Sequence, residues 1–165
     1  MNALAAIIIV TNLAYTAAFD TVTRCPAWVA YDLEPGEIVA TARAAIPFHA
    51  DPSAPGSDNA ADYAGSGFDR GHMAPAADFN FDASTLRQTY SFVNVCPMAR
   101  ALNRGAWRMA EERVRQLAAS GTVRVVTFPI YADGTNRMGR VRVPDAFAKV
   151  AFGAFGAALW VMPNK

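Results

Sequence analysis

The chain has 165 residues, of which 53% are hydrophobic and 11% aromatic, and its formal net charge is only +1. These values are typical of a globular protein with a sizeable hydrophobic core, and they exclude an intrinsically disordered chain. A net charge so close to zero also excludes attraction of nucleic acid by a strong overall positive field.

Strong β-formers predict the first structural elements. Runs of β-branched and aromatic residues predict strands near 6–10, 14–19 and 27–32. Residues 1–10 lack the basic segment of a secretory signal and are too short to span a bilayer. We therefore predict no convincing signal peptide and no membrane span; a degenerate signal or anchor stays open, and so does the compartment. Residues 51–67 are rich in Asp, Pro, Ser, Asn and Gly, which predicts a loop.

The middle of the chain predicts the order strand, long loop, strand, helix. We expect strands at about 68–72 and 90–95, separated by an excursion over 73–88. A helix should begin around 103–106 and continue to about 119. Its apolar stripe is formed by Trp107, Ala110, Val114 and Leu117.

The last third of the chain predicts more strands. Residues 123–128 are expected to form a buried strand and 157–162 a closing strand. Residues 147–155 could be helix or strand, because the glycines weaken both interpretations. The whole sequence predicts one α+β domain over residues 1–165, with a mainly antiparallel sheet beside the helix.

Charged residues are unevenly distributed along the chain. Residues 51–82 contain six aspartates and one arginine, whereas residues 100–115 contain five arginines and two glutamates. Thirteen of the fifteen basic residues are arginine, whose forked guanidinium suits phosphate. A charged helix face is usually only solvated, so its meaning depends on the neighbouring motifs.

The two cysteines, Cys25 and Cys96, do not have the spacing of a zinc ribbon or knuckle. The sequence leaves open whether they form a disulfide or remain buried thiols.

The segment 67–75, Gly-Phe-Asp-Arg-Gly-His-Met-Ala-Pro, places chemically useful side chains on a predicted strand. Alternation puts Arg70 and His72 on one face and Asp69 on the other. A neutral imidazole, whose ordinary pKa is ~6.5, can accept a proton from water at physiological pH. Arg70 would stabilise charge on a phosphate, while Asp69 is expected to brace the strand or loop.

The segment 102–107, Leu-Asn-Arg-Gly-Ala-Trp, places a second set on the predicted helix. Asn103 can bind Mg²⁺ through its amide oxygen, can cap the helix, or can do both. Glu111 lies two turns further along, roughly 11–12 Å away, so a water-mediated contact with the same ion is expected. Glu112 is the competing carboxylate and is expected to face solvent.

Three arginines of the helix are candidate phosphate contacts. Arg115 follows Glu111 by one turn, so a phosphate contact and an ion pair with Glu111 are both open. Arg104 and Arg108 are the other two candidates.

These motifs occur in a recognisable order. The succession D-R-G-H-x-A-P, N-x-x-P at 94–97 and L-N-x-G-x-W-x-x-x-E resembles the DNA/RNA non-specific endonucleases, members of the ββα-metal nuclease fold. The resemblance covers most of the chain and implies a ββα-metal core, a hairpin plus a catalytic helix, at about 68–119. It also implies roles for six side chains: His72 as general base, Asn103 as direct metal ligand, Glu111 as water-mediated ligand, Arg70 and Arg115 as supporting arginines, and Asn94 as a structural residue.

The resemblance implies a metal-dependent, sequence-non-specific endonuclease that hydrolyses phosphodiester bonds of DNA and RNA and leaves 5′-phosphates. Mg²⁺ is the expected cofactor, with Mn²⁺ or another divalent ion as an alternative. A homodimer and an inhibitor protein are further partners that the resemblance allows. Two other interpretations stay open: a nucleic-acid-binding module of the same fold that has lost turnover, and a nuclease toxin controlled by an inhibitor.

Overall fold

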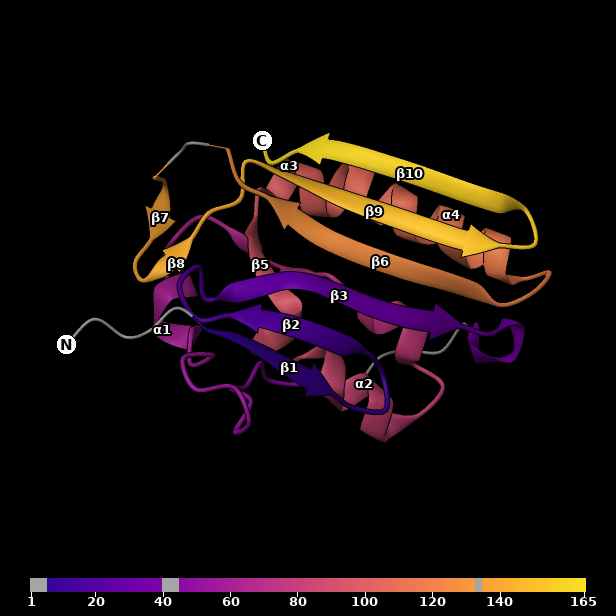
Figure 1. Ribbon diagram of the computed structural model, residues 1–165, viewed down its shortest axis with the longest axis horizontal. Coiled ribbons are helices and arrows are strands. Elements are labelled where there is room, and N and C mark those ends of the chain that lie inside the picture. Colours follow the sequence, from indigo (N-terminus) through magenta and orange to yellow (C-terminus); the bar gives the residue numbers. More distant parts are fainter. Residues whose placement is uncertain (1–5, 40–44, 133–134) are drawn as a thin grey trace.

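The computed structural model describes residues 6–39, 45–132 and 135–165 (Figure 1). Residues 1–5 of the apolar N-terminal run lie outside the described residues. Among the described residues, no helix is both long enough and apolar enough to cross a bilayer.

A six-stranded sheet forms the main layer, in the order β1-β2-β3-β6-β9-β10, and each neighbouring pair is antiparallel. Its strands are β1 (Ile7–Thr11), β2 (Thr16–Asp20), β3 (Cys25–Leu33), β6 (Val123–Ile130), β9 (Ala146–Gly153) and β10 (Gly156–Pro163). The predicted antiparallel sheet is therefore confirmed. The ambiguous segment 147–155 is mostly strand β9, because it pairs on one side with β6 and on the other with β10.

The expected hairpin and helix are also present. Strand β4 (Asp69–His72) pairs with β5 (Val95–Met98), and His72 lies opposite Val95. The chain then continues through α3 (Arg100–Leu102), a π-helical turn η4 (Asn103–Trp107) and α4 (Arg108–Ala118). Figure 1 shows α4 lying across the sheet behind β6, β9 and β10.

Two predicted boundaries are wrong. The second strand was expected near 90–95, but it begins at Val95 because residues 92–94 form a 3₁₀ turn, η3 (Phe92–Asn94), capped by the Ser91 side chain. The helix begins at Arg100 rather than at 103–106, and it is interrupted at Gly105, where φ is −110° and ψ is −108°. Apolar periodicity does not report either break, because the buried positions continue across both.

The connections contain six short elements: η1 (Pro35–Glu37), α1 (Ala60–Tyr63), η2 (Ala76–Phe79), α2 (Ala83–Thr89), β7 (Arg137–Met138) and β8 (Val141–Arg142). Of these, α1, η2 and α2 lie in segments that were expected to be loop. Helix α2 begins at a side-chain cap, because an oxygen of Asp82 accepts hydrogen bonds from the backbone N–H groups of Ser84 and Thr85. Elements η2 and α2 together occupy the predicted excursion over 73–88.

The hairpin is packed too closely for a side chain at its centre. A Cβ added to Gly71 would lie 2.5 Å from the Cβ of Met98 on the partner strand, and 2.8 Å from the end of that side chain. Glycine at this position therefore allows β5 to pack closely against β4 between Arg70 and His72, two of the predicted site residues.

Helix α4 and the hairpin meet the sheet through a shared apolar core. Trp107 is fully buried, and its ring centroid lies 5.6 Å from that of Phe147 on β9. Val114 and Ala118 of the same helix are also buried. Cys25 and Cys96 are both buried and are not joined by a disulfide, which answers the question that the sequence left open.

Candidate active site

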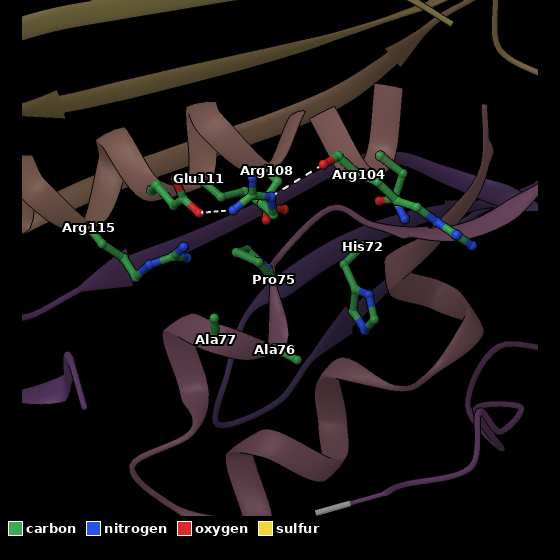
Figure 2. Close-up of a pocket in the computed structure, with 10 residues that line it drawn as sticks. His72, Pro75, Ala76, Ala77, Arg104, Arg108, Glu111 and Arg115 are labelled. Atoms are coloured by element: carbon green, nitrogen blue, oxygen red, sulfur yellow. Dashed lines mark hydrogen bonds and ion pairs between the residues drawn. The ribbon is translucent and has the colours of Figure 1, made fainter. Parts of the chain in front are cut away.

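A cavity of about 510 Å³ separates the start of α4 from the loop that follows β4 (Figure 2). Figure 2 shows Arg104, Arg108, Glu111 and Arg115 on the helix side and Pro75, Ala76 and Ala77 on the opposite wall. The residues that line the cavity are His72, Pro75, Ala76, Ala77, Asn103, Arg104, Arg108, Glu111, Glu112 and Arg115. Two motifs that are separate in the sequence therefore meet around one space.

His72, the last residue of β4, is held through its ring and its backbone. Its ring centroid lies 5.3 Å from that of Phe48 and 5.2 Å from that of Tyr90, the latter edge-on. Its carbonyl oxygen accepts a hydrogen bond of 3.1 Å from the indole nitrogen of Trp107. The helix and the hairpin are thus joined at the residue expected to act as general base.

Asn103 is oriented by Asp69. The Nδ2 atom of Asn103 donates a hydrogen bond of 3.0 Å to Oδ2 of Asp69. An ionised carboxylate can only accept hydrogen bonds, so the amide nitrogen must face it and the amide oxygen must lie on the other side. Asp69 was expected to brace the strand or loop, and its hydrogen bond also sets which atom of Asn103 faces away from the carboxylate.

Asp69 is kept ionised by the arginine beside it. Arg104 donates to both carboxylate oxygens, at 2.8 and 2.9 Å. This hydrogen bonding lowers the pKa of Asp69, with burial opposing the shift and Asn103 adding to it. Asp69 is therefore a carboxylate over the whole physiological pH range, as the orientation of the Asn103 amide requires.

The donor set fits a hard divalent cation. The Asn103 amide and the Glu111 carboxylate line the same cavity, and both offer oxygen ligands. Across the described parts of the chain, no group of three or more His, Cys, Asp or Glu residues could hold a metal. Mg²⁺ commonly keeps several waters and binds through one or two protein oxygens, which fits a donor set of this size.

Each of the three predicted phosphate-contacting arginines is paired with a carboxylate. Arg104 pairs with Asp69, and Arg108 pairs with Glu112 one turn along. Glu112 was expected to face solvent, and 44% of its side chain is exposed, although the residue also lines the cavity and pairs with Arg108. Arg115 pairs with Asp78 at 2.8 Å, a partner outside the two alternatives that the sequence offered.

Arg70 and His72 both pack against Phe48, as expected of two side chains on one face of the strand. Among the described residues that line the cavity, Arg70 is not included. Its guanidinium carbon lies 5.3 Å from the ring centroid of Phe48 and 5.3 Å from that of Tyr63. Its Nε is buried and has no hydrogen-bond partner among the described residues. The two rings attract the Arg70 cation. A contact between Arg70 and a phosphate stays a prediction.

Asn94 is buried behind the cavity. Its Nδ2 donates to the carbonyl oxygens of Ala74, at 2.8 Å, and of Thr89, at 2.9 Å, and its Oδ1 accepts from the backbone N–H of Ala74 at 2.8 Å. These bonds tie the loop after His72 to the end of α2, as expected of a structural residue.

Sequence reasoning missed two buried charged residues beneath the cavity. Asp78 is fully buried, and burial raises its pKa against the opposing effect of Arg115. Lys149 is also fully buried; its Nζ donates to the carbonyl oxygen of Met73 at 3.3 Å and to Oγ1 of Thr127 at 3.1 Å. The same Nζ lies 4.7 Å from the ring centroid of Trp107. The segment 143–149, which ends in Lys149, resembles a loop signature of the endonuclease family, but no role was predicted for either residue.

Comparison with known proteins fits this arrangement. The model of the DNA/RNA non-specific endonuclease family matches residues 7–165. The chain belongs to this family. It is 33% identical over 175 residues to mitochondrial endonuclease G of Bos taurus, which covers 93% of this chain and 58% of that protein. It is 34% identical over 133 residues to mitochondrial nuclease EXOG of Xenopus laevis, covering 78% of this chain and 37% of the relative.

The fold is shared with a solved relative as well. The crystal structure of the EndoG/EndoGI complex, on the mechanism of EndoG inhibition, matches with a TM-score of 0.83 and 28% identity, over 95% of this chain and 74% of that one. This match confirms the expected ββα-metal nuclease fold. The chain spans a little over half the length of the endonuclease G relatives, 58% for the bovine protein and 58% for the human one.

Proposed function

We propose that this protein is a metal-dependent, sequence-non-specific endonuclease that hydrolyses phosphodiester bonds of DNA and RNA. The observation that carries the proposal is that His72 and Asn103, from the hairpin and the helix, line one cavity together with Glu111. Family membership supports the same reaction class. Contacts with phosphate rather than with base edges give little sequence specificity.

In this proposal His72 is the general base. A neutral imidazole nitrogen accepts a proton from a water as that water attacks phosphorus in line with the leaving 3′-oxygen, so the products carry 5′-phosphates. Trp107 supports the strand end by its hydrogen bond to the His72 carbonyl. Arg104, Arg108 and Arg115 are the proposed contacts with the phosphate backbone, and Arg70 is proposed to support the same charge.

The proposed cofactor is Mg²⁺, with Mn²⁺ or another divalent ion as the alternative. Asn103 would hold it directly through its amide oxygen, and Glu111 would hold it through water. When bound, the ion would supply Lewis-acid polarisation of the phosphate and offset charge on the leaving oxygen. Asp69 supports this role by holding the amide nitrogen of Asn103 on the opposite side.

The inhibited state of a structural relative suggests a protein partner. Because EndoG has been crystallised with EndoGI, we propose that an inhibitor protein can also control this nuclease. A homodimer stays a prediction from the family resemblance.

The proposal is tested by incubating the purified protein with supercoiled plasmid and with RNA in Mg²⁺. We expect nicking of the plasmid and degradation of the RNA, and both should stop when the divalent ion is chelated. Absence of cleavage with Mg²⁺, Mn²⁺, Co²⁺ and Ca²⁺ in turn would contradict the proposal. Retained binding of the nucleic acid in that case would favour the binding-module interpretation.

Asp69→Asn is expected to raise the Mg²⁺ concentration at half-maximal activity, or to lower activity, by roughly 10–100-fold. The new amide can face Asn103 with either its oxygen or its nitrogen, so the Asn103 oxygen is no longer held in one orientation. The measurement is a Mg²⁺ titration of plasmid nicking.

Asp32→Asn is the matched control for this titration, because Asp32 also forms a two-pronged pair with an arginine, Arg124, at 2.8 Å for both bonds. That pair joins β3 and β6 and contributes nothing to the cavity lining among the described residues. The control should keep the wild-type Mg²⁺ dependence. Equal Mg²⁺ titration curves for Asp69→Asn and the wild type would contradict the proposal that Asp69 orients the Asn103 amide.

A further inference from the structure

We propose that Asp78 is a positioning residue that holds the Arg115 guanidinium ready for a nucleic-acid phosphate. The inference rests on the proposed nuclease function and extends it to a residue outside the cavity. Asp78 contacts no substrate in this account and acts only through Arg115.

The contacts around Asp78 fix its carboxylate completely. Its Oδ1 accepts a hydrogen bond of 2.8 Å from Nη1 of Arg115, and its Oδ2 accepts one of 2.8 Å from the hydroxyl of Tyr31 on β3. The Tyr31 ring lies edge-on to Phe79, with centroids 5.4 Å apart. The carboxylate thus joins the sheet, the turn η2 and the far end of the cavity.

The Asp78–Arg115 pair differs from the other two arginine pairs in burial. The Arg104 and Arg108 side chains are 69% and 59% exposed, so their pairs are solvated and contribute little order. The Arg115 side chain is only 19% exposed, and that of Asp78 is 0% exposed. Of these three arginines, Arg115 is therefore the one held in a single place before a substrate arrives.

Stability alone is a poor explanation for this pair. Removing two charges from water is costly, and well-packed apolar residues often serve a fold as well or better. What a buried carboxylate supplies is a fixed guanidinium, so less side-chain freedom is lost when a phosphate is bound.

The turn η2 carries both Asp78 and part of the cavity wall. Ala76 and Ala77 line the cavity wall opposite the helix, and Asp78 follows them directly with its side chain buried. Arg115 keeps part of its surface on the cavity, as Figure 2 shows. Its remaining guanidinium N–H groups are the donors that would meet a phosphate.

The test measures the salt dependence of nucleic-acid binding in the absence of cleavage. The parent is the His72→Ala variant in buffer without divalent ions, and the probe is a fluorescent DNA duplex followed by anisotropy over a NaCl series. Each phosphate contact contributes roughly 0.9 to the slope of log affinity against log salt concentration. We expect Asp78→Asn and Arg115→Met each to lower the slope by roughly this amount and to weaken binding on the order of tenfold.

A double variant separates positioning from a structural role. If Asp78 acts through Arg115, adding Asp78→Asn to Arg115→Met should weaken binding no further. The same addition should raise the melting temperature, because it removes a buried carboxylate that has lost its hydrogen-bonded cation, Arg115. Arg113→Met, which removes an arginine hydrogen-bonded to Gln116 and absent from the cavity lining, is the matched control and should keep the parental slope.

Two results would overturn the inference. One is a salt slope that Asp78→Asn leaves unchanged. The other is a loss of binding affinity on adding Asp78→Asn that is equally large in the parent and in the Arg115→Met variant. Failure of the wild-type protein to cleave plasmid or RNA would instead contradict the nuclease function, and the binding comparison would still decide the role of Asp78.

Discussion

Replacing His72 by alanine is expected to slow plasmid nicking on the order of 100- to 10,000-fold, the usual effect of losing a general base. The side chain lines the cavity between hairpin and helix, and its ring is packed against Phe48 and Tyr90. Removing it leaves no imidazole there to accept the proton of the attacking water. The measurement is the initial rate of nicking in Mg²⁺ as a function of pH.

The pH profile distinguishes a base from a packing residue. A base must be neutral, so the wild-type rate should fall as the pH is lowered through the imidazole titration, and His72→Ala should lose that fall. His49→Ala is the matched control, because the ring nitrogens of His49 contact the carbonyl oxygens of Ala50 and Arg87, at 3.1 and 3.2 Å, and His49 is not among the described residues that line the cavity. The control should keep the wild-type rate within about twofold, as most surface substitutions do. Equal nicking rates for His72→Ala and the wild type would contradict the proposal that His72 is the general base.

Replacing Asn103 by alanine is expected to lower activity at a fixed Mg²⁺ concentration by roughly 100-fold or more, because the proposed direct ligand is lost. Asp69 and Arg104 would remain paired, so the helix start should keep its fold. The measurement is a Mg²⁺ titration of nicking, with DNA binding in metal-free buffer as the control. Binding should be unchanged, since the affinity that phosphate contacts provide does not depend on the ion.

Exchanging the amide and the carboxylate of positions 103 and 69 tests the same ligand. The single variant Asn103→Asp should be less active than the wild type, because its carboxylate would face that of Asp69. In the wild type, Oδ2 of Asp69 lies 3.0 Å from the Asn103 amide nitrogen. Combining Asn103→Asp with Asp69→Asn restores one amide and one carboxylate at the same two positions. We expect the combination to be more active than Asn103→Asp alone. Full activity of Asn103→Ala at low Mg²⁺ would contradict the proposed ligand.

The parts of the fold that the sequence predicts best are those with local signals. Strands β1, β2 and β3 follow runs of β-branched and aromatic residues, and β6 alternates between buried and partly exposed positions. The start of β5 could not be placed, because the buried run through Phe92 and Val95 belongs first to a 3₁₀ turn and then to a strand. The π-helical turn at Gly105 could not be predicted either, because the spacing of apolar residues does not indicate which carbonyl each backbone N–H contacts.

The candidate site divides in the same way. His72, Asn103 and Glu111 belong to motifs, and in the folded chain they line one cavity, while their catalytic and metal-binding roles stay predictions. Asp78 and Lys149 lie 37 and 76 residues from the partners Arg115 and Met73, so only the folded chain brings these pairs together.

Alternation placed Arg70 on the same face as His72, and both side chains pack against Phe48. Alternation could not show that the Arg70 guanidinium lies between two aromatic rings and is not among the described residues that line the cavity. The aromatic rings of Phe48 and Tyr63 come from segments that the strand pattern cannot place.

The central claim is that His72 and Asn103 serve one phosphate beside one divalent ion. The most direct measurement is a crystal structure of the His72→Ala variant with Mn²⁺ and a short DNA duplex, in which anomalous scattering locates the ion. We predict one anomalous peak at bonding distance from Oδ1 of Asn103, with a backbone phosphate between that peak and the backbone of residue 72. A peak at any other group, or a phosphate bound away from this cavity, would contradict the account.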